Sequence, residues 1–158
     1  MYADCNNVNT QIVRFASPSA LAKTTTVHYC RTTPGGNQAL TDCGVTGLLG
    51  LFGDEESPRT SYGVEEEFAK RIRAGEIVKI DGTYYGGIDV IVNEFSKEDA
   101  LREVEKRLDR PHVNVMIHEQ YFYTDYRNYQ SNYEEKLSAV FALLRENGYE
   151  SRFFEEMI

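Results

Sequence analysis

The chain has 158 residues, of which 41% are hydrophobic and 27% are charged, and its formal net charge at pH 7 is -8. This composition is typical of a soluble globular domain, and no apolar run reaches the roughly 20 residues that a membrane-spanning helix needs. The negative charge argues against nucleic acids and anionic membranes as partners, because both attract basic surfaces. Small neutral ligands, cations and other proteins remain as partners.

The cysteines and the N-terminal residues bear on where the protein works. The N-terminal stretch has no basic start followed by an apolar core, so it does not resemble a secretory signal, and we expect a cytoplasmic protein. Cys5, Cys30 and Cys43 are an odd number without Cys-x-x-Cys spacing. This pattern fits reduced thiols better than a disulfide framework or a zinc site. We therefore expect no metal and no other cofactor.

Helical and strand patterns alternate along the first half of the chain. A helix with an apolar stripe at Val8, Ile12 and Phe15 follows Asp4 and ends before Pro18. Further on, the pattern predicts helices at 34–42 and 64–74, strands at 24–29 and 45–52, and a loop at 53–63. The strand at 45–52 is apolar without alternation, which is typical of a strand covered on both faces of a parallel sheet.

The second half opens with a hairpin. Asp81-Gly82 joins short strands at 77–80 and 83–85, a strong signal for a tight turn, and we expect this hairpin to be an excursion from the main sheet. The remaining predicted elements are strands at 88–92, 113–117 and 151–154, a helix beginning after Ser96, and a helix beginning at Tyr133. Helices that alternate with apolar strands predict an α/β fold of one domain, 1–158, with a mostly parallel sheet and flanking helices.

Polar residues follow four of the predicted strands. They are His28, Asp54 with Glu55, Asn93 with Glu94, and His118 with Glu119. Because the carboxyl ends of parallel strands share one edge, where ligands bind, we expect His28, Asn93, His118 and Glu119 on one rim. A structural role is the alternative for each: a histidine satisfied by a carbonyl, a solvated acidic loop, or a cap on the next helix.

A tyrosine-rich loop follows the last of these pairs. Its members are Tyr121, Tyr123, Tyr126, Tyr129 and Tyr133. Tyrosine combines a flat apolar face with a hydroxyl group, so it suits stacking on sugar rings and equally suits packing at a hydrated boundary or a subunit contact. We take His118 and Glu119 as candidate catalytic residues. The candidate ligand-binding residues are His28, Asp54, Asn93, Tyr121, Tyr123 and Tyr126.

Four stretches carry a resemblance to a known family. The runs MIHEQYFYTDYRNYQ, TTTVHYC, GVTGLLGLFG and ENGYESRFFEE resemble the C-terminal half of proteins related to polysaccharide deacetylases. The resemblance implies a partial (β/α) barrel of the glycoside hydrolase/deacetylase type. It also places Met116-Ile117-His118 where that family has a late Leu-x-His motif, whose histidine acts as an acid.

The sequence departs from that family at its metal site. The family holds a divalent metal with an early Asp-Asp motif and a His-x-x-x-His motif, whereas the only histidines here are His28, His112 and His118. A His-Glu pair without a metal has no evident way to activate water. Two hypotheses therefore remain open: a degenerate deacetylase-like module that binds carbohydrate or another small polar ligand, and an assembly protein that self-associates, as a dimer, through exposed sheet edges.

Overall fold

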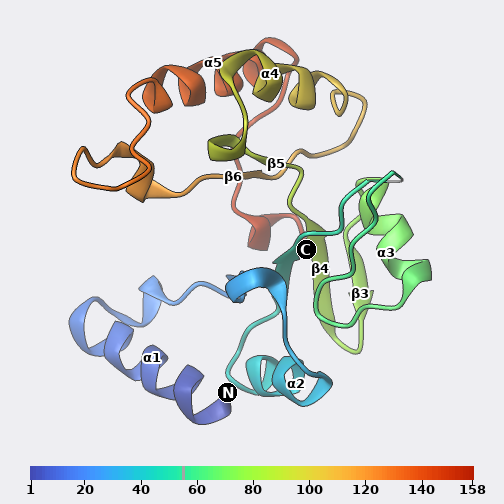
Figure 1. The fold of residues 1–158 in the computed structure, drawn as a ribbon. Helices are drawn as coiled ribbons and strands as arrows, with labels where there is room; N and C mark the ends of the chain where they lie inside the picture. Colours follow the sequence, from blue (N-terminus) through green and yellow to red (C-terminus); the bar gives the residue numbers. More distant parts are fainter. Residues whose placement is uncertain (55) are drawn as a thin grey trace. The chain divides into compact units, whose positions relative to one another are not determined.

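The computed structural model describes residues 1–54 and 56–158 (Figure 1). They form two compact units: unit 1 comprises Met1–Gly87 with Arg152–Ile158, and unit 2 comprises Ile88–Ser151. Both units combine helices with parallel strands. The α/β class, the mostly parallel pairing and the flanking helices predicted from the sequence are therefore correct.

Unit 1 is built around an open four-stranded sheet. Its elements, with η for a 3₁₀ turn, are α1 (Tyr2–Phe15), η1 (Pro18–Ala20), β1 (Thr24–Thr25), η2 (His28–Cys30), α2 (Pro34–Asp42), β2 (Gly47–Gly50), α3 (Glu66–Arg73), β3 (Val78–Ile80), β4 (Thr83–Gly87) and η5 (Phe154–Glu156). The strand order is β1-β2-β4-β3, and only the β3–β4 pair is antiparallel. Local sequence sets the helix ends. Thr33 caps α2 by accepting the Gly36 N–H, and Gly44 ends it at a φ of +91°.

The predicted hairpin is present, but it is not an excursion from the sheet. Its turn places both Asp81 and Gly82 at positive φ, 46° and 87°, as the tight hairpin turn requires. Its second strand, β4, pairs with β2 on one side and β3 on the other. The reason is that Thr83, Tyr85 and Gly86 are buried, as in an internal strand. The expectation of a peripheral hairpin was therefore wrong.

The chain returns to unit 1 after unit 2 and covers this sheet with one aromatic ring. Phe154, 6% exposed, lies over Gly47 of β2 and Gly86 of β4. A Cβ atom at Gly86 would lie 2.7 Å from that ring, and one at Gly47 would lie 2.9 Å from it. The two glycines thus make the space that the ring fills. Residues 151–154 do not form the predicted strand, because Phe154 begins the 3₁₀ turn η5 instead.

Unit 2 packs two helices on a two-stranded parallel sheet. It contains β5 (Val90–Ile91), η3 (Val92–Glu94), α4 (Lys97–Glu105), β6 (Val115–Met116), η4 (Glu119–Phe122) and α5 (Tyr133–Glu146). Ser96 caps α4, as predicted, by accepting the Asp99 N–H. The hydrophobic core joins β5, α4 and α5 through Val90, Val92, Ala100, Val104, Tyr133, Leu137, Val140 and Leu144.

The four strands expected to share one edge belong to two sheets. β1 and β2 are in the four-stranded sheet of unit 1, whereas β5 and β6 form the separate sheet of unit 2. The physical reason is that β4 already occupies the edge of β2 at which a further parallel strand would have paired. The expectation of a single sheet edge carrying His28 together with Asn93, His118 and Glu119 was therefore wrong. Within the described parts of the chain, no helix has both the length and the apolar character needed to cross a membrane.

Candidate functional site

The carboxyl ends of β5 and β6 bring Asn93 and His118 into contact. Ile91 pairs with Met116 in register, so the segments that leave both strands start side by side. Asn93 lies in the turn η3 after β5, and His118 lies two residues beyond β6. His118 Nδ1 is 2.7 Å from Asn93 Oδ1. This is the arrangement expected for polar residues that follow adjacent parallel strands.

The hydrogen bond with Asn93 indicates which nitrogen of the imidazole is the donor. An amide oxygen only accepts, so Nδ1 carries the proton and donates it to Asn93. In the neutral ring, Nε2 is then left as an acceptor, and no partner for it occurs among residues 1–54 and 56–158. The half-buried His118 thus offers one basic nitrogen, held in a defined direction, to whatever approaches it.

Tyr133 holds the backbone of His118. Its side chain is fully buried at the start of α5, and its Oη accepts the His118 N–H at 3.2 Å. Burial, the largest influence, raises the pKa of the Tyr133 hydroxyl, while the hydrogen bond from His118 acts in the opposite direction. The phenol therefore stays neutral at physiological pH and acts as a fixed support under the histidine.

A buried lysine is linked to Asn93 through Gln130. Lys136 is 3% exposed, and its Nζ donates to Val92 O at 3.3 Å, Phe95 O at 2.6 Å and Gln130 Oε1 at 2.7 Å. Gln130 Nε2 in turn donates to Asn93 O at 2.9 Å. Burial lowers the pKa of Lys136. Three neutral acceptors satisfy its three N–H donors, so the ammonium ties the backbone of Val92 and Phe95 to α5, and Gln130 links it to the backbone of Asn93.

The tyrosine-rich loop lies beside His118. The Tyr121 ring is edge-on to the imidazole with centroids 6.3 Å apart, and it contacts Tyr126 edge-on at 5.4 Å and Tyr133 at 5.7 Å. Tyr121 and Tyr126 are half-buried, whereas Tyr123 is 56% exposed. Tyr121 thus contacts the imidazole directly, and Tyr126 supports the Tyr121 ring. Glu119 begins η4 and is exposed.

The other candidate residues belong to unit 1. His28 is exposed at the start of η2, with its ring 4.1 Å from that of Tyr29. Asp54 is exposed, and its Oδ1 accepts the Ser57 N–H at 2.7 Å, which is a local turn contact. The prediction at Glu55 lies outside the described residues. The contacts that join candidate site residues to one another are thus contacts within unit 2.

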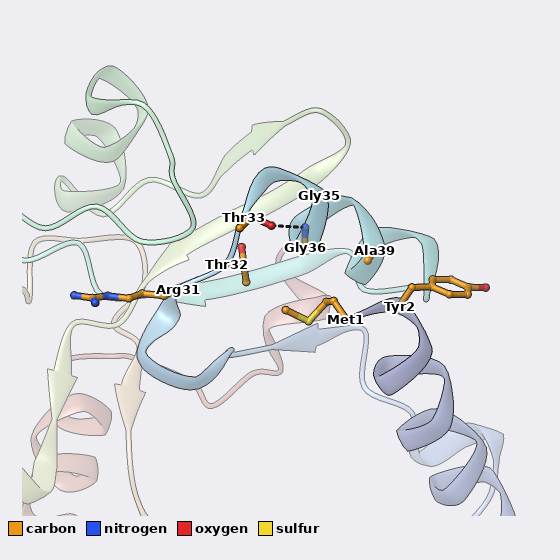
Figure 2. Close-up of a pocket in the computed structure, with 8 residues that line it drawn as sticks. All are labelled: Met1, Tyr2, Arg31, Thr32, Thr33, Gly35, Gly36 and Ala39. Atoms are coloured by element: carbon orange, nitrogen blue, oxygen red, sulfur yellow. Dashed lines mark hydrogen bonds between the residues drawn. The ribbon is translucent and has the colours of Figure 1, made fainter.

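Unit 1 has a hollow of its own at the N-terminal end of α2. It is open, has a volume of about 690 Å³, and is bordered by Met1, Arg31 and the first turn of α2 (Figure 2). Figure 2 shows the Thr33 hydroxyl turned onto the Gly36 N–H and the Arg31 side chain directed away from the other labelled residues. Sequence analysis did not predict this hollow, because it depends on α1 and α2 meeting.

The donors of this chain do not fit the divalent metal of the resembled family. Among residues 1–54 and 56–158, no three side chains of His, Cys, Asp or Glu converge as a metal site would require. One ring nitrogen of His118 is hydrogen-bonded to Asn93, and the next residue, Glu119, is exposed. No step of a mechanism is therefore assigned to a metal.

Comparisons with protein-family models, with curated proteins and with solved structures gave no match for this chain.

Sequence analysis missed two members of the network, Gln130 and Lys136. A signal existed for Lys136: Tyr133, Leu137 and Val140 form the buried stripe of α5, and position 136 lies on that stripe, three residues after Tyr133. A lysine at a core position predicts a buried polar contact. No local pattern marks Gln130, because its partners Asn93 and Lys136 are remote or on the next helix.

Proposed function

We propose that unit 2 binds a small polar ligand of the carbohydrate class, without turnover, at the surface formed by His118, Asn93 and the tyrosine-rich loop. The observation that carries this proposal is the 2.7 Å contact between His118 Nδ1 and Asn93 Oδ1, which leaves Nε2 as an oriented acceptor. A sugar hydroxyl is a donor that such a nitrogen recognises.

The aromatic rings supply the second element of carbohydrate recognition. Tyr121 and Tyr126 brace each other edge-to-face, and Tyr123 exposes more than half of its side chain. Flat tyrosine rings bury the apolar C–H faces of a sugar, while their hydroxyls stay near water. A neutral ligand also suits a protein with a formal charge of -8, which repels anionic partners.

The fold bears on the evolutionary origin of the chain. We propose that the chain is a partial barrel of the deacetylase type that has kept the late histidine, His118, and lacks the metal-binding half. The parallel order of β1, β2 and β4, each crossover containing a helix, is compatible with that origin. Under this proposal His118 recognises ligand and does not activate water, since among the described residues no three His, Cys, Asp or Glu side chains converge on a metal site.

Titration with chitooligosaccharides, acetylated and deacetylated, tests the proposal. In ¹H–¹⁵N NMR spectra we expect saturable shifts confined to the amides around His118 and the tyrosine-rich loop. His118→Ala and Tyr121→Ala should each weaken binding by roughly fivefold to tenfold, which corresponds to about 1–1.4 kcal/mol, the scale of one hydrogen bond or one ring contact.

A matched control is Phe153→Ala, which removes a ring that is 77% exposed on unit 1. Its affinity should equal that of the unaltered chain. Absence of saturable shifts with a panel of neutral sugars would refute the carbohydrate assignment. Release of acetate from the acetylated sugars would refute the absence of turnover.

A second candidate function is self-association through α1. This helix contains no buried residue, and its apolar Val8 and Phe15 are 54% and 79% exposed. An antiparallel pair of α1 helices, one from each copy, would cover these side chains and would bring Asp4 of one copy near Arg14 of the other. Burial of the apolar area, worth about 25 cal/mol per Å², is the driving force.

Analytical ultracentrifugation at high micromolar concentration distinguishes a monomer from a dimer. We expect a mass of twice the 18.1 kDa of one chain, and a monomer after the paired changes Val8→Glu and Phe15→Glu. The control is Phe153→Glu, which alters an equally exposed ring outside α1 and should leave the dimer intact. A monomeric unaltered chain would contradict this second function and would leave the ligand site of unit 2 untouched.

A further inference from the structure

One face of α1 carries Cys5 toward the end of α2. Tyr2, Cys5 and Asn9 recur at i, i+3 and i+7, so they share a face of the helix. Cys43, the residue after α2, contacts both ends of that face: its Sγ donates to Tyr2 O at 3.6 Å, and its carbonyl accepts from Asn9 Nδ2 at 3.2 Å. Cys5 lies between these two contacts and therefore faces Cys43.

The two sulfurs also interact electrostatically. Burial, followed by the hydrogen bond and charge of the Cys43 sulfur, raises the pKa of the Cys5 thiol to about 11. Both cysteines are only half-buried, so a small oxidant reaches them, whereas Cys30 is buried at 2% exposure. The pair thus combines proximity with access, which a structural cysteine such as Cys30 lacks.

We propose that Cys5 and Cys43 form a reversible intramolecular disulfide that fastens α1 to α2. With oxidised glutathione as the oxidant, one cysteine thiolate attacks the glutathione disulfide and releases one glutathione thiolate. The second cysteine then displaces the other glutathione and closes the Cys5–Cys43 bond. The two protein thiols lose two electrons and two protons, and the oxidant becomes two glutathione thiols.

The bond would act on a helix with little other anchorage. α1 has no buried residue, and Asn9 and Tyr2 supply its hydrogen bonds to Cys43. Figure 2 shows the start of α1 against α2, with Met1 and Tyr2 bordering the same hollow as Gly36 and Ala39. The disulfide would therefore hold two walls of that hollow at a constant separation, and reduction would release one of them.

Oxidation of the full chain in glutathione redox buffers tests the proposal. We expect peptide mapping under non-reducing conditions to find Cys5 joined to Cys43, with a loss of two hydrogen atoms in mass and full reversal by a reducing dithiol. The reaction should quicken as the pH rises, because the raised pKa of Cys5 keeps its thiolate scarce at neutral pH. Amide hydrogen exchange in α1 should slow by roughly tenfold or more in the oxidised chain.

Single substitutions separate this bond from other oxidation. Cys5→Ser and Cys43→Ser should each abolish the link and the slower exchange, whereas Cys30→Ala should leave both unchanged. A link that joins Cys30, a bond between two copies of the chain, or thiols that stay unlinked after prolonged oxidation would overturn the proposal. So would a Cys5–Cys43 link that leaves hydrogen exchange in α1 unchanged.

Discussion

Phe154→Ala should lower the free energy of unfolding by about 3–5 kcal/mol, the usual cost of removing a buried phenylalanine ring. The ring of Phe154 fills the space above Gly47 and Gly86, and neither glycine has a side chain that could replace the lost contacts. Urea unfolding followed by tyrosine fluorescence and circular dichroism measures the loss. Phe153→Ala is the control, since its exposed ring should change stability by no more than about 0.5 kcal/mol.

A double-mutant cycle with Gly86→Ala shows whether the ring and the glycine act together. Alone, Gly86→Ala should destabilise, because the new Cβ would lie 2.7 Å from the Phe154 ring. In the Phe154→Ala background that overlap is gone and the methyl group occupies part of the cavity. The cost of Gly86→Ala should then fall by about 1–3 kcal/mol. Additive costs would show that the tail of the chain does not pack on β4.

Asp89→Ala should destabilise unit 2 by about 2–3 kcal/mol, because it removes a buried carboxylate that pairs with the half-buried Arg110 and accepts the Asn114 N–H. The Asp89 side chain is 7% exposed, and its Oδ1 forms an ion pair with Arg110 and lies 4.0 Å from Arg107 Nε. Its Oδ2 accepts the Asn114 N–H at 2.7 Å, while the Asp89 N–H donates to Asn114 O at 2.9 Å. Asp89 therefore sets the register of β5 and β6.

The variants Asp89→Asn and Asp125→Ala show whether the charge and the buried position of Asp89 cause the loss of stability. Asparagine keeps an oxygen acceptor but loses the charge, so its cost should be smaller than that of alanine. Asp125 is exposed, and its replacement should change the free energy of unfolding by no more than about 0.5 kcal/mol. Equal stabilities of the Asp89 and Asp125 variants in chemical denaturation would contradict the role given to Asp89. Loss of the β5–β6 register should also disturb the contact between Asn93 and His118.

Elements with a local cause were predictable from the sequence. The helix at 34–42 has the predicted bounds, because Thr33 caps it and Gly44 ends it. The Asp81-Gly82 turn and the Ser96 cap also follow from residues within four positions of one another. In α1 the helix was predicted correctly, but Val8 and Phe15 of its apolar stripe are exposed, since periodicity indicates a face and not what covers that face.

Elements with a distant cause were not predictable. The hairpin sequence does not indicate that β4 pairs with β2. The residues paired in these two strands are 37 positions apart in the chain, as in Gly47↔Tyr84. The packing of Phe154 on Gly47 likewise joins the end of the chain to its first third. In the candidate site, strand ends predicted that Asn93 and His118 would be close, while the supports from Tyr133 and Lys136 required the position of α5.

The return of the chain to unit 1 has a consequence for biosynthesis. The ribosome makes residues 88–151 after the strands of the four-stranded sheet and before Phe154, whose ring covers that sheet. Unit 2 is a continuous stretch, so its core forms from neighbours in synthesis. The sheet of unit 1 must wait, with Gly47 and Gly86 uncovered, until unit 2 has been made. Translation thus places the completion of the first unit after that of the second.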